Sequence, residues 1–255
     1  MKTLVIIPSR LAATRLPGKP LLKINGLSII SHVVKRAVEA NIGEVYVAAE
    51  DQEIVKDVKK NGGQAILTSS DHRTGTDRIF EAINKLKKTD VELLINLQGD
   101  EPLMNIDDIK SLHNKMIQSK SELGTLASYI VDKKMLEKQS VVKVITSERL
   151  EETNFPTAQS FERKLPRKVD NVYHHLGIYC YRLETLKKFF SFKQSSNEIK
   201  KKLEQFRALD NHIKINVALA KESPIGVDTE EDFVAIKKIM EYKNWWVRSF
   251  FKELL

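Results

Sequence analysis

The chain has 255 residues, of which 42% are hydrophobic and 30% charged, with a single cysteine and a formal net charge of +8. This length allows a sizeable core, and the lone cysteine excludes an internal disulfide framework. No apolar run approaches the roughly 18 residues that a membrane span needs, and no secretory signal opens the chain. We therefore expect a cytoplasmic protein without a transmembrane segment.

The positive charge is concentrated at the start of the chain. Seven lysines and arginines precede the first acidic residue, Glu39, whereas later lysine clusters recur at helical spacing and indicate solvated helix faces. A surface that binds duplex nucleic acid would more often carry a basic face or arm. We therefore expect a small polyanion as the partner and no nucleic acid.

The first hundred residues alternate buried strands with amphipathic helices. Apolar strands without in-and-out alternation are predicted at 3–8, 44–49, 64–68 and 91–97, and helices at 27–40, 51–63 and 76–88. Strands of this kind, each followed by a helix, are typical of a parallel sheet covered on both faces. The sequence therefore predicts an α/β fold.

The pattern loosens after about residue 130. Strands are predicted at 141–146, 174–182 and 213–220, and helices at 184–191, 197–210 and 229–243, whereas the polar, proline-containing segment 147–172 cannot be assigned. No break in composition marks a linker. We expect one domain over 1–255 with a smaller lobe within about 130–205.

Residues 240–255 form an aromatic C-terminal tail. Trp245, Trp246, Phe250 and Phe251 follow a short amphipathic pattern. The main interpretation is packing on the body or across a dimer, and contact with a membrane surface is the alternative.

The basic segment RLAATRLPGKP, residues 10–20, directly follows the first predicted strand. Ligands of open α/β sheets bind at the carboxyl ends of the strands. Arg10, Arg15 and Lys19 can there contact several phosphate oxygens at once. The segment matches neither GxxxxGK[ST] nor GxGxxG, and a solvated basic loop is the alternative.

Two aspartates follow predicted strands. Asp100 lies in LQGDEP after strand 91–97, and Asp228 lies in GVDT after strand 213–220. Carboxylates in such places can hold Mg²⁺, whereas the alternatives are a Gly-Asp turn at Asp100 and a helix N-cap at Asp228. Together with the basic segment they suit phosphoryl or nucleotidyl transfer.

Two further segments carry polar groups suited to a ligand. TGTDR, residues 74–78, leads into a helix, so its backbone N–H groups can recognise a base or ribose, although an N-cap needs no ligand. His174 and His175 begin a strand, where the alternation of side chains lets one of them face a ligand.

Several segments together resemble the CMP-Kdo synthetases, the 3-deoxy-manno-octulosonate cytidylyltransferases. They are IIPSRLAATRLPGKPL, SSDHRTGTDRI, INLQGDEPL, HHLGIYCYR, LEQFRAL and GVDTEED, and the resemblance runs from about residue 3 to about 237. It implies a Rossmann-like nucleotidyltransferase fold, with a mostly parallel sheet covered by helices and a smaller sugar-binding and dimerisation lobe. It also implies CTP, Mg²⁺, usually a homodimer, and a place in lipopolysaccharide biosynthesis.

The resemblance implies a role for each matched residue. The triphosphate would be held by Arg10, Arg15 and Lys19. The metal would be held by Asp100 and Asp228, which with Lys19 and Arg15 would carry the catalysis. The cytidine side would be lined by Thr74, Gly75, Thr76 and Arg78, with Gln98 beside them or bridging to the sugar. The acidic sugar would be faced by His175, Tyr179, Glu204 and Gln205. The anomeric hydroxyl would attack the α-phosphorus in line, and pyrophosphate would leave.

One segment departs from the family pattern. Where the family reads close to YFSRA(T/P)IP, this chain has NFPTAQSFERK, with Pro156 and Thr157 in place of Ser-Arg. An arginine is a natural partner for a sugar acid's carboxylate. Either Arg163, Lys164 or Arg167 substitutes for it, or the acceptor is another sugar acid such as 8-amino-Kdo, or the chain is a non-catalytic nucleotide-binding homologue.

Overall fold

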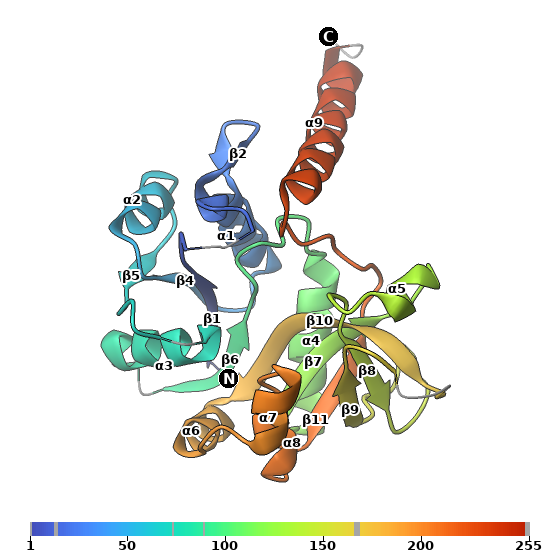
Figure 1. Cartoon of the computed structure of the whole chain (residues 1–255). Helices are drawn as coiled ribbons and strands as arrows, with labels where there is room; N and C mark the ends of the chain where they lie inside the picture. The colour runs from blue at the N-terminus through green and yellow to red at the C-terminus, as the bar shows by residue number, and fades with distance from the viewer. Residues whose placement is uncertain (1, 13–14, 73, 89, 166–168, 253–255) are drawn as a thin grey trace.

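Figure 1 shows a computed structural model of the chain, in which helices cover both faces of a large sheet. The structure describes residues 2–12, 15–72, 74–88, 90–165 and 169–252, with side chains described as far as residue 242. The strands are β1 (Lys2–Ser9), β2 (Lys23–Ile24), β3 (Leu27–Ser28), β4 (Glu44–Ala49), β5 (Ala65–Leu67), β6 (Val91–Asn96), β7 (Leu123–Ser128), β8 (Lys143–Thr146), β9 (Ala158–Glu162), β10 (Val172–Arg182) and β11 (Ile215–Leu219). The helices are η1 (Lys19–Leu21), α1 (Ile29–Ala40), α2 (Gln52–Lys60), α3 (Gly75–Leu86), α4 (Ile106–Ser119), α5 (Lys134–Glu137), α6 (Leu183–Ser191), α7 (Ser196–Lys201), α8 (Phe206–Asp210) and α9 (Glu230–Lys252).

The central sheet is mostly parallel, as the sequence predicted. Within the described residues nine strands form it, and its main path runs β11-β7-β10-β6-β1-β4-β5. All neighbours along this path are parallel except β10, which runs antiparallel to both β6 and β7. β8 and β9 extend the sheet by antiparallel pairing next to β10. β10 therefore ties the predicted lobe directly into the main sheet.

The strands are apolar throughout because the sheet is buried on both faces. On β1, Leu4 and Ile6 belong to one hydrophobic cluster, with α3 and α6, whereas Val5 and Ile7 belong to another, with α1, α2 and α4. Successive side chains of a strand point to opposite faces. The absence of alternation in the sequence is thus the direct signature of this two-sided core.

The helix predicted over 197–210 is wrong, because the chain turns in its middle. α7 ends at Lys201, Lys202 adopts a left-handed φ of 53°, and α8 begins only at Phe206. Leu203 and Gln205 are buried in this turn, so tertiary packing overrides a continuous helical pattern. The unassigned segment 147–172 contains the strand β9, whose polar sequence gave no periodic signal.

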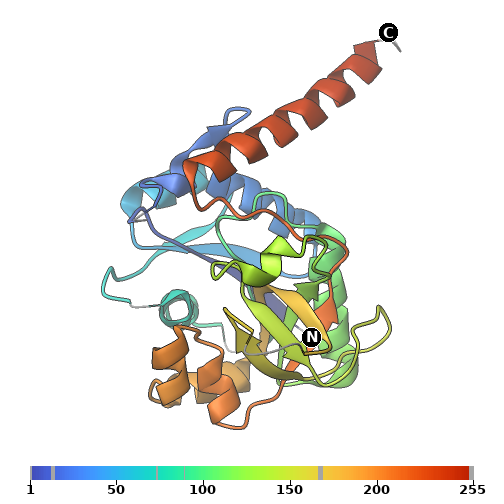
Figure 2. The same cartoon turned by 45° about the vertical axis from the view of Figure 1, so that its right-hand side comes forward.

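The last helix, α9, projects away from the sheet in two views (Figures 1 and 2). Near its start Ile236 is buried in a small cluster with Ile24, Ile29 and Val227. The predicted packing of Trp245 and Trp246 lies outside the described side chains. In the part of the chain that the structure describes, no helix is both long and apolar enough to cross a bilayer.

Gly99 follows β6 and lies close against the backbone of Pro8 near the end of β1. A Cβ atom at this position would lie 2.9 Å from the backbone oxygen of Pro8. We expect Gly99→Ala to lower the free energy of unfolding by ~1–3 kcal/mol, because backbone must move to relieve the contact. Urea unfolding checks this.

Gly226→Ala is the matched control for that change. The nearest atom to its added Cβ would be Glu101 Cγ at 3.8 Å, an ordinary contact. We expect a change within about 0.5 kcal/mol. Equal effects of the two substitutions would contradict the importance of the Gly99 contact.

Candidate active site

The basic segment after β1 is folded onto the end of the sheet. The Leu11 backbone N–H donates to Asp51 Oδ2 at 2.8 Å, and the Gly18 N–H donates to the Leu11 carbonyl at 3.1 Å. Gly18 has a φ of +69°, which glycine adopts without strain, and η1 begins at the next residue. The chain is thereby turned so that Arg10, Arg15 and Lys19 line one cleft.

Two carboxylates from distant segments meet beside this loop. The Val227 N–H donates to the Asp100 carbonyl at 2.9 Å, which brings Asp228 alongside Asp100. Lys19 Nζ lies 2.7 Å from Asp100 Oδ2 and 3.2 Å from Asp228 Oδ1, and Arg15 lies 2.9 Å from Asp228 Oδ2. The Lys19 side chain is only 14% exposed, against 60% for Arg15. Lys19 therefore sits between the two carboxylates, at the floor of the cleft.

Asp228 does not cap α9. The Asp232 N–H donates to Thr229 Oγ1, and Asp232 Oδ2 accepts from the backbone N–H groups of Asp228 and Thr229. Thr229 and Asp232 thus provide the reciprocal cap of the helix. The Asp228 carboxylate is left to face Asp100 across Lys19.

The first cleft has a volume of about 370 Å³ and lies at the carboxyl ends of β1 and β6. Opposite the basic segment it is lined by Thr74 and Gly75, where α3 begins. Thr74 caps α3 by accepting from the Asp77 N–H, and Asp77 bonds back to the Thr74 N–H. Thr74 is therefore both the N-cap of α3 and a lining residue of the first cleft, so a capping role and the predicted ligand role can coexist.

Arg78 lines the first cleft but is largely committed to the protein. It is 3% exposed, donates to Thr68 Oγ1 at 2.7 Å and to the Ser69 carbonyl at 3.1 Å, and pairs with Glu50. These bonds hold the guanidinium in a fixed orientation at the wall of the cleft. Arg78 therefore shapes the site as well as lining it.

A second cleft of about 320 Å³ adjoins the first. Gln98, Asp100 and Asp228 line both clefts. Gln98 is fixed at this junction because its Nε2 donates to the Gly177 carbonyl of β10 at 2.7 Å. A group bound in either cleft would thus meet the same two carboxylates.

Both adjacent histidines of β10 are among the residues that line the second cleft, although their rings have different partners, and the expectation that only one of them faces a ligand stays a prediction. The strand is irregular directly after them: its register against β7 shifts between Leu176 and Tyr179. His174 Nδ1 lies 2.6 Å from Ser223 Oγ, and His175 Nε2 lies 3.1 Å from Thr125 Oγ1. Burial lowers the pKa of His175 to about 3, so this ring is neutral near pH 7.

The remaining residues predicted to face a sugar divide into two groups. Tyr179 and Gln205 line the second cleft. Glu204 is not among the residues lining either cleft; its Oε2 accepts from Thr76 Oγ1 of α3 at 2.9 Å. Thr76 likewise does not line the first cleft. The structure thus joins Thr76 and Glu204 to each other behind the two clefts.

Glu101 and His72 are site residues that the sequence reasoning missed. Glu101 lines the second cleft, and its burial, together with the nearby Asp100 and Asp228 carboxylates, raises its pKa to about 8. His72 lines the first cleft and pairs with Glu81. Glu101 lies in the motif LQGDEP and His72 in SSDHRTGTDRI. Their positions next to residues already predicted to belong to the site were the sequence signal that could have identified them.

The segment that departs from the family pattern lies beside β11. The Val217 N–H donates to the Pro156 carbonyl and the Ser147 N–H to the Thr157 carbonyl, and neither Pro156 nor Thr157 lines the second cleft. Arg163 lies closer, since it donates to the carbonyls of Gln139 and Lys202, next to lining residues of that cleft. Lys164 is exposed, and Arg167 lies outside the described residues.

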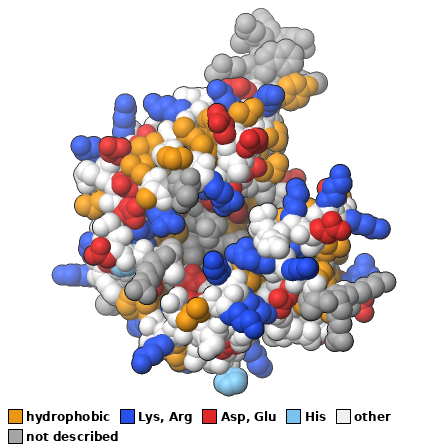
Figure 3. Space-filling view, viewed as in Figure 1, with side chains coloured by type: hydrophobic (Ala, Val, Ile, Leu, Met, Phe, Trp, Pro, Cys, Tyr) orange, Lys and Arg blue, Asp and Glu red, His pale blue; other side chains and the backbone are white. Residues whose placement is uncertain are grey.

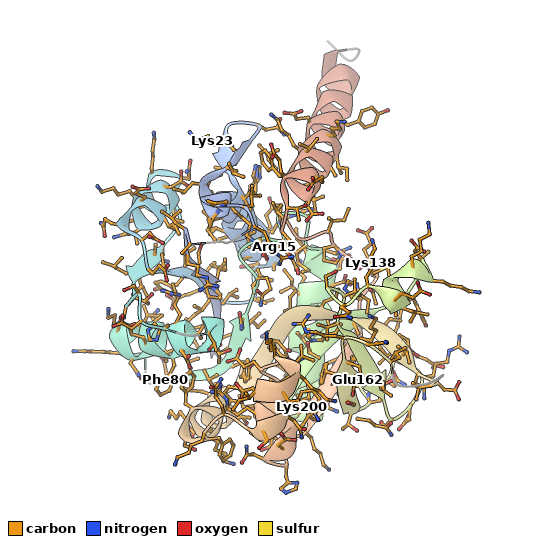
Figure 4. The ribbon with its side chains drawn as sticks, viewed as in Figure 1. Arg15, Lys23, Phe80, Lys138, Glu162 and Lys200 are labelled. Carbon is orange, nitrogen blue, oxygen red and sulfur yellow. The ribbon has the colours of Figure 1, made fainter. Side chains whose placement is uncertain are left out.

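The wider face around the site is cationic. Figure 3 shows lysine and arginine side chains gathered across the middle of the molecule. Figure 4 places Arg15 centrally, with Lys138 of the α5 segment on one side and Lys200 of α7 below. This distribution favours an anionic ligand at the junction of the clefts.

The buried His175 should affect how the stability of the protein depends on pH. Its pKa is about 3 in the folded protein and about 6.5 in an unfolded chain. Below pH ~6.5 the unfolded state takes up a proton that the folded state does not. The free energy of unfolding therefore decreases as the pH is lowered, by up to ~1.4 kcal/mol per pH unit. Between pH 7.5 and 5 we expect the wild type to lose about 2 kcal/mol more than His175→Gln in urea unfolding. Parallel pH profiles would contradict the buried, neutral histidine.

Comparison with known proteins agrees with this geometry. Residues 4–215 match the family model described as cytidylyltransferase. The 3-deoxy-manno-octulosonate cytidylyltransferase of Rhodopseudomonas palustris (strain BisB18) is 41% identical over 246 residues, covering 94% of this chain and 98% of that protein. Its counterpart from Afipia carboxidovorans is 41% identical over 240 residues, covering 93% and 96%.

A solved structure extends the likeness to three dimensions. A CMP:2-keto-3-deoxy-manno-octonic acid synthetase complexed with CTP is 33% identical, with a TM-score of 0.86, and the match covers 95% of this chain and 100% of that one. The Rossmann-like nucleotidyltransferase fold predicted from the sequence is confirmed. The chain belongs to the cytidylyltransferase family and, within it, to the 3-deoxy-manno-octulosonate cytidylyltransferases.

Proposed function

We propose that this chain transfers the cytidylyl group of CTP to the anomeric hydroxyl of 3-deoxy-manno-octulosonate, releasing pyrophosphate. The meeting of two clefts at Gln98, Asp100 and Asp228 is the observation that carries the proposal. Cations on the outer side of this junction suit a triphosphate. Polar, uncharged groups on the inner side, among them Gln205, suit the hydroxyls of a sugar.

The residues of the chain supply positioning and charge. The nucleoside lies toward Thr74 and Gly75 and the triphosphate toward Arg10, Arg15 and Lys19, with its α-phosphorus at the junction. The acceptor lies in the second cleft, so its anomeric oxygen approaches from the side opposite the pyrophosphate. The new bond joins this oxygen to the α-phosphorus, the bond to the pyrophosphate breaks, and the hydroxyl proton passes to solvent. Charge neutralisation by fixed cations favours this transfer.

The Asp100 and Asp228 carboxylates fit a divalent cation. Mg²⁺ in proteins is usually held by one or two carboxylates together with substrate phosphates and water. In the part of the chain that is described, no three acidic, histidine or cysteine side chains converge as a metal site, which suits a metal completed by nucleotide oxygens. When bound there, Mg²⁺ would neutralise phosphate charge and acidify the attacking hydroxyl.

The carboxylate of the acceptor needs its own partner. Pro156 and Thr157 do not line the second cleft, so they supply no side chain to it in this chain. Arg163 is a candidate for this partner. It donates hydrogen bonds to the carbonyls of Gln139 and Lys202, which are next to residues that line the second cleft. A homodimer, a cytoplasmic location and a place in lipopolysaccharide biosynthesis are part of this proposal and are supported by the family resemblance.

Release of pyrophosphate tests the proposed reaction. With CTP and Mg²⁺, we expect release that depends on 3-deoxy-manno-octulosonate and stops when EDTA removes the metal. Release with the 8-amino analogue alone would move the assignment to another sugar acid. Binding of CTP without turnover on either acceptor would contradict the proposed activity and favour a non-catalytic homologue.

Asp100→Asn tests the junction itself. The substitution removes one charge at the point where the two clefts meet, and we expect the rate to fall by ~10²–10³ or more, by analogy with the loss of one oxyanion-hole donor. Asp107→Asn is the matched control, because Asp107 is an exposed residue of α4 paired with Lys221. Near-normal turnover in folded Asp100→Asn protein would exclude Asp100 from catalysis.

Lys19→Met tests the metal assignment without turnover. In the absence of nucleotide, Lys19 Nζ already neutralises Asp100 and Asp228. Its removal should tighten binding of Mn²⁺ alone by about tenfold, since a neighbouring charge contributes one to a few kcal/mol at a partly exposed site. Electron paramagnetic resonance of free Mn²⁺ measures this affinity.

Lys23→Met is the control for the general change in charge. Lys23 is exposed, carries no described ion pair and is labelled on β2 in Figure 4. Its substitution should leave Mn²⁺ affinity within about twofold, since Lys23 pairs with neither aspartate and the field of an exposed charge is weakened by water and salt. Unchanged affinity in Lys19→Met, or an equal gain in Lys23→Met, would contradict a metal site at the two aspartates.

A further inference from the structure

Helix α3 lines the first cleft and contacts a segment that lines the second. Its N-cap Thr74 and first residue Gly75 line the first cleft. One residue further on, Thr76 is 2% exposed and turns its hydroxyl away from that cleft, toward the segment that walls the second. One turn beyond, Phe80 stacks on Phe190 of α6, with ring centroids 4.1 Å apart. Figure 4 shows Phe80 on the part of α3 that faces α6. The start of α3 is therefore fastened to the half of the molecule that holds the acceptor cleft.

The turn between α7 and α8 is the other end of this connection. Lys202 leaves the helix in a left-handed conformation, and the three residues after it alternate in direction. Leu203 and Gln205 line the second cleft, whereas Glu204 between them reaches back to α3. The hydrogen bond from Thr76 Oγ1 to Glu204 Oε2 is 2.9 Å long. This bond, together with the polar contact of Thr74 with the same carboxyl group, links a helix start that lines the first cleft to a turn that lines the second.

The bond is placed where stability alone would not favour a carboxyl group. Among the described residues, Glu204 Oε1 is buried and has no hydrogen-bond partner. Burial raises the pKa of Glu204, and its polar contacts with the side chains of Thr76 and Thr74 oppose this only in part. Its neighbours include the buried Tyr179 and Tyr181. An unsatisfied buried polar atom lowers the stability of a protein, and such losses are tolerated chiefly at functional sites.

We propose that the Thr76–Glu204 hydrogen bond couples the two clefts, so that nucleotide bound against Thr74 and Gly75 orders the turn at 203–205 for the acceptor. Glu204 is then a positioning residue, since it lines neither cleft. The identities of the two ligands rest on the proposed function, whereas the coupling itself concerns the chain alone. Coupling between binding sites is reciprocal, so the acceptor must tighten nucleotide binding by the same factor.

Hydrogen exchange measured by mass spectrometry tests the coupling without an acceptor. The probe is α,β-methylene-CTP with Mg²⁺, which cannot release pyrophosphate. In the wild type we expect this probe to slow amide exchange at 203–206 by about tenfold, within the 5–150-fold range typical of coupled sites. In Thr76→Val, which keeps the shape of the side chain but removes the hydroxyl, the slowing should fall below about twofold.

Two matched variants separate the hydrogen bond from packing. Thr76→Ser and Glu204→Gln each retain a donor or acceptor for the bond, and both should keep the protection. Glu204→Leu fills the space of the side chain without providing an acceptor, so this variant should lose the protection at 203–206. It allows the test to be made even if Thr76→Val folds poorly. Protection at 203–206 that persists in the folded Val and Leu variants would overturn the proposal.

The same experiment distinguishes the coupling from the proposed function. Protection at 74–79 reports binding in the first cleft, so its absence in the wild type would count against CTP as the ligand. Protection at 74–79 without protection at 203–206 in the wild type would overturn the coupling and leave the proposed reaction standing.

A calorimetric titration then gives a second readout. The probe should tighten acceptor binding about tenfold in the wild type and Thr76→Ser, but below about twofold in Thr76→Val.

Discussion

The site depends on one electrostatic constraint, which is that two carboxylates must lie side by side next to a surface built to attract anions. Asp100 and Asp228 would repel each other without a cation between them. Lys19 lies between them in this structure, at 2.7 and 3.2 Å. The loop that carries Lys19 is in turn held by Asp51 and by the turn at Gly18. The basic loop, the strand end and the segment before α9 therefore form one unit.

The sheet explains how the second cleft comes to lie beside the first. β10 runs antiparallel between β6 and β7, so its middle passes the carboxyl end of β6, where Gly177 accepts the hydrogen bond of Gln98. The same strand carries His174, His175 and Tyr179 into the second cleft. The antiparallel strand thus allows the second cleft to share the Asp100 and Asp228 carboxylates with the first.

The sequence predicts those parts of the fold that local pattern determines. Strands β1, β4 and β6 are continuous apolar runs because both of their faces are buried, and the basic loop is recognisable because no acidic residue accompanies it. The break between α7 and α8 is invisible in the sequence, since Lys202 and Leu203 continue a helical pattern and only tertiary packing imposes the turn. The partnership of Thr76 with Glu204 is likewise non-local. The motifs indicated that both residues belong to the site, but not that they contact each other.

The positions of the residues in the two clefts, rather than the sequence motifs alone, therefore indicate which residue would act on which ligand. The central claim is that nucleotide and acceptor occupy separate clefts and meet at Gln98, Asp100 and Asp228. A crystal structure with α,β-methylene-CTP, Mg²⁺ and 3-deoxy-manno-octulosonate tests it most directly. The account predicts the triphosphate on the segment from Arg10 to Lys19, the α-phosphorus between the two aspartates, and the anomeric oxygen facing it from the second cleft. Both ligands in one cleft, or a triphosphate bound away from that segment, would contradict it.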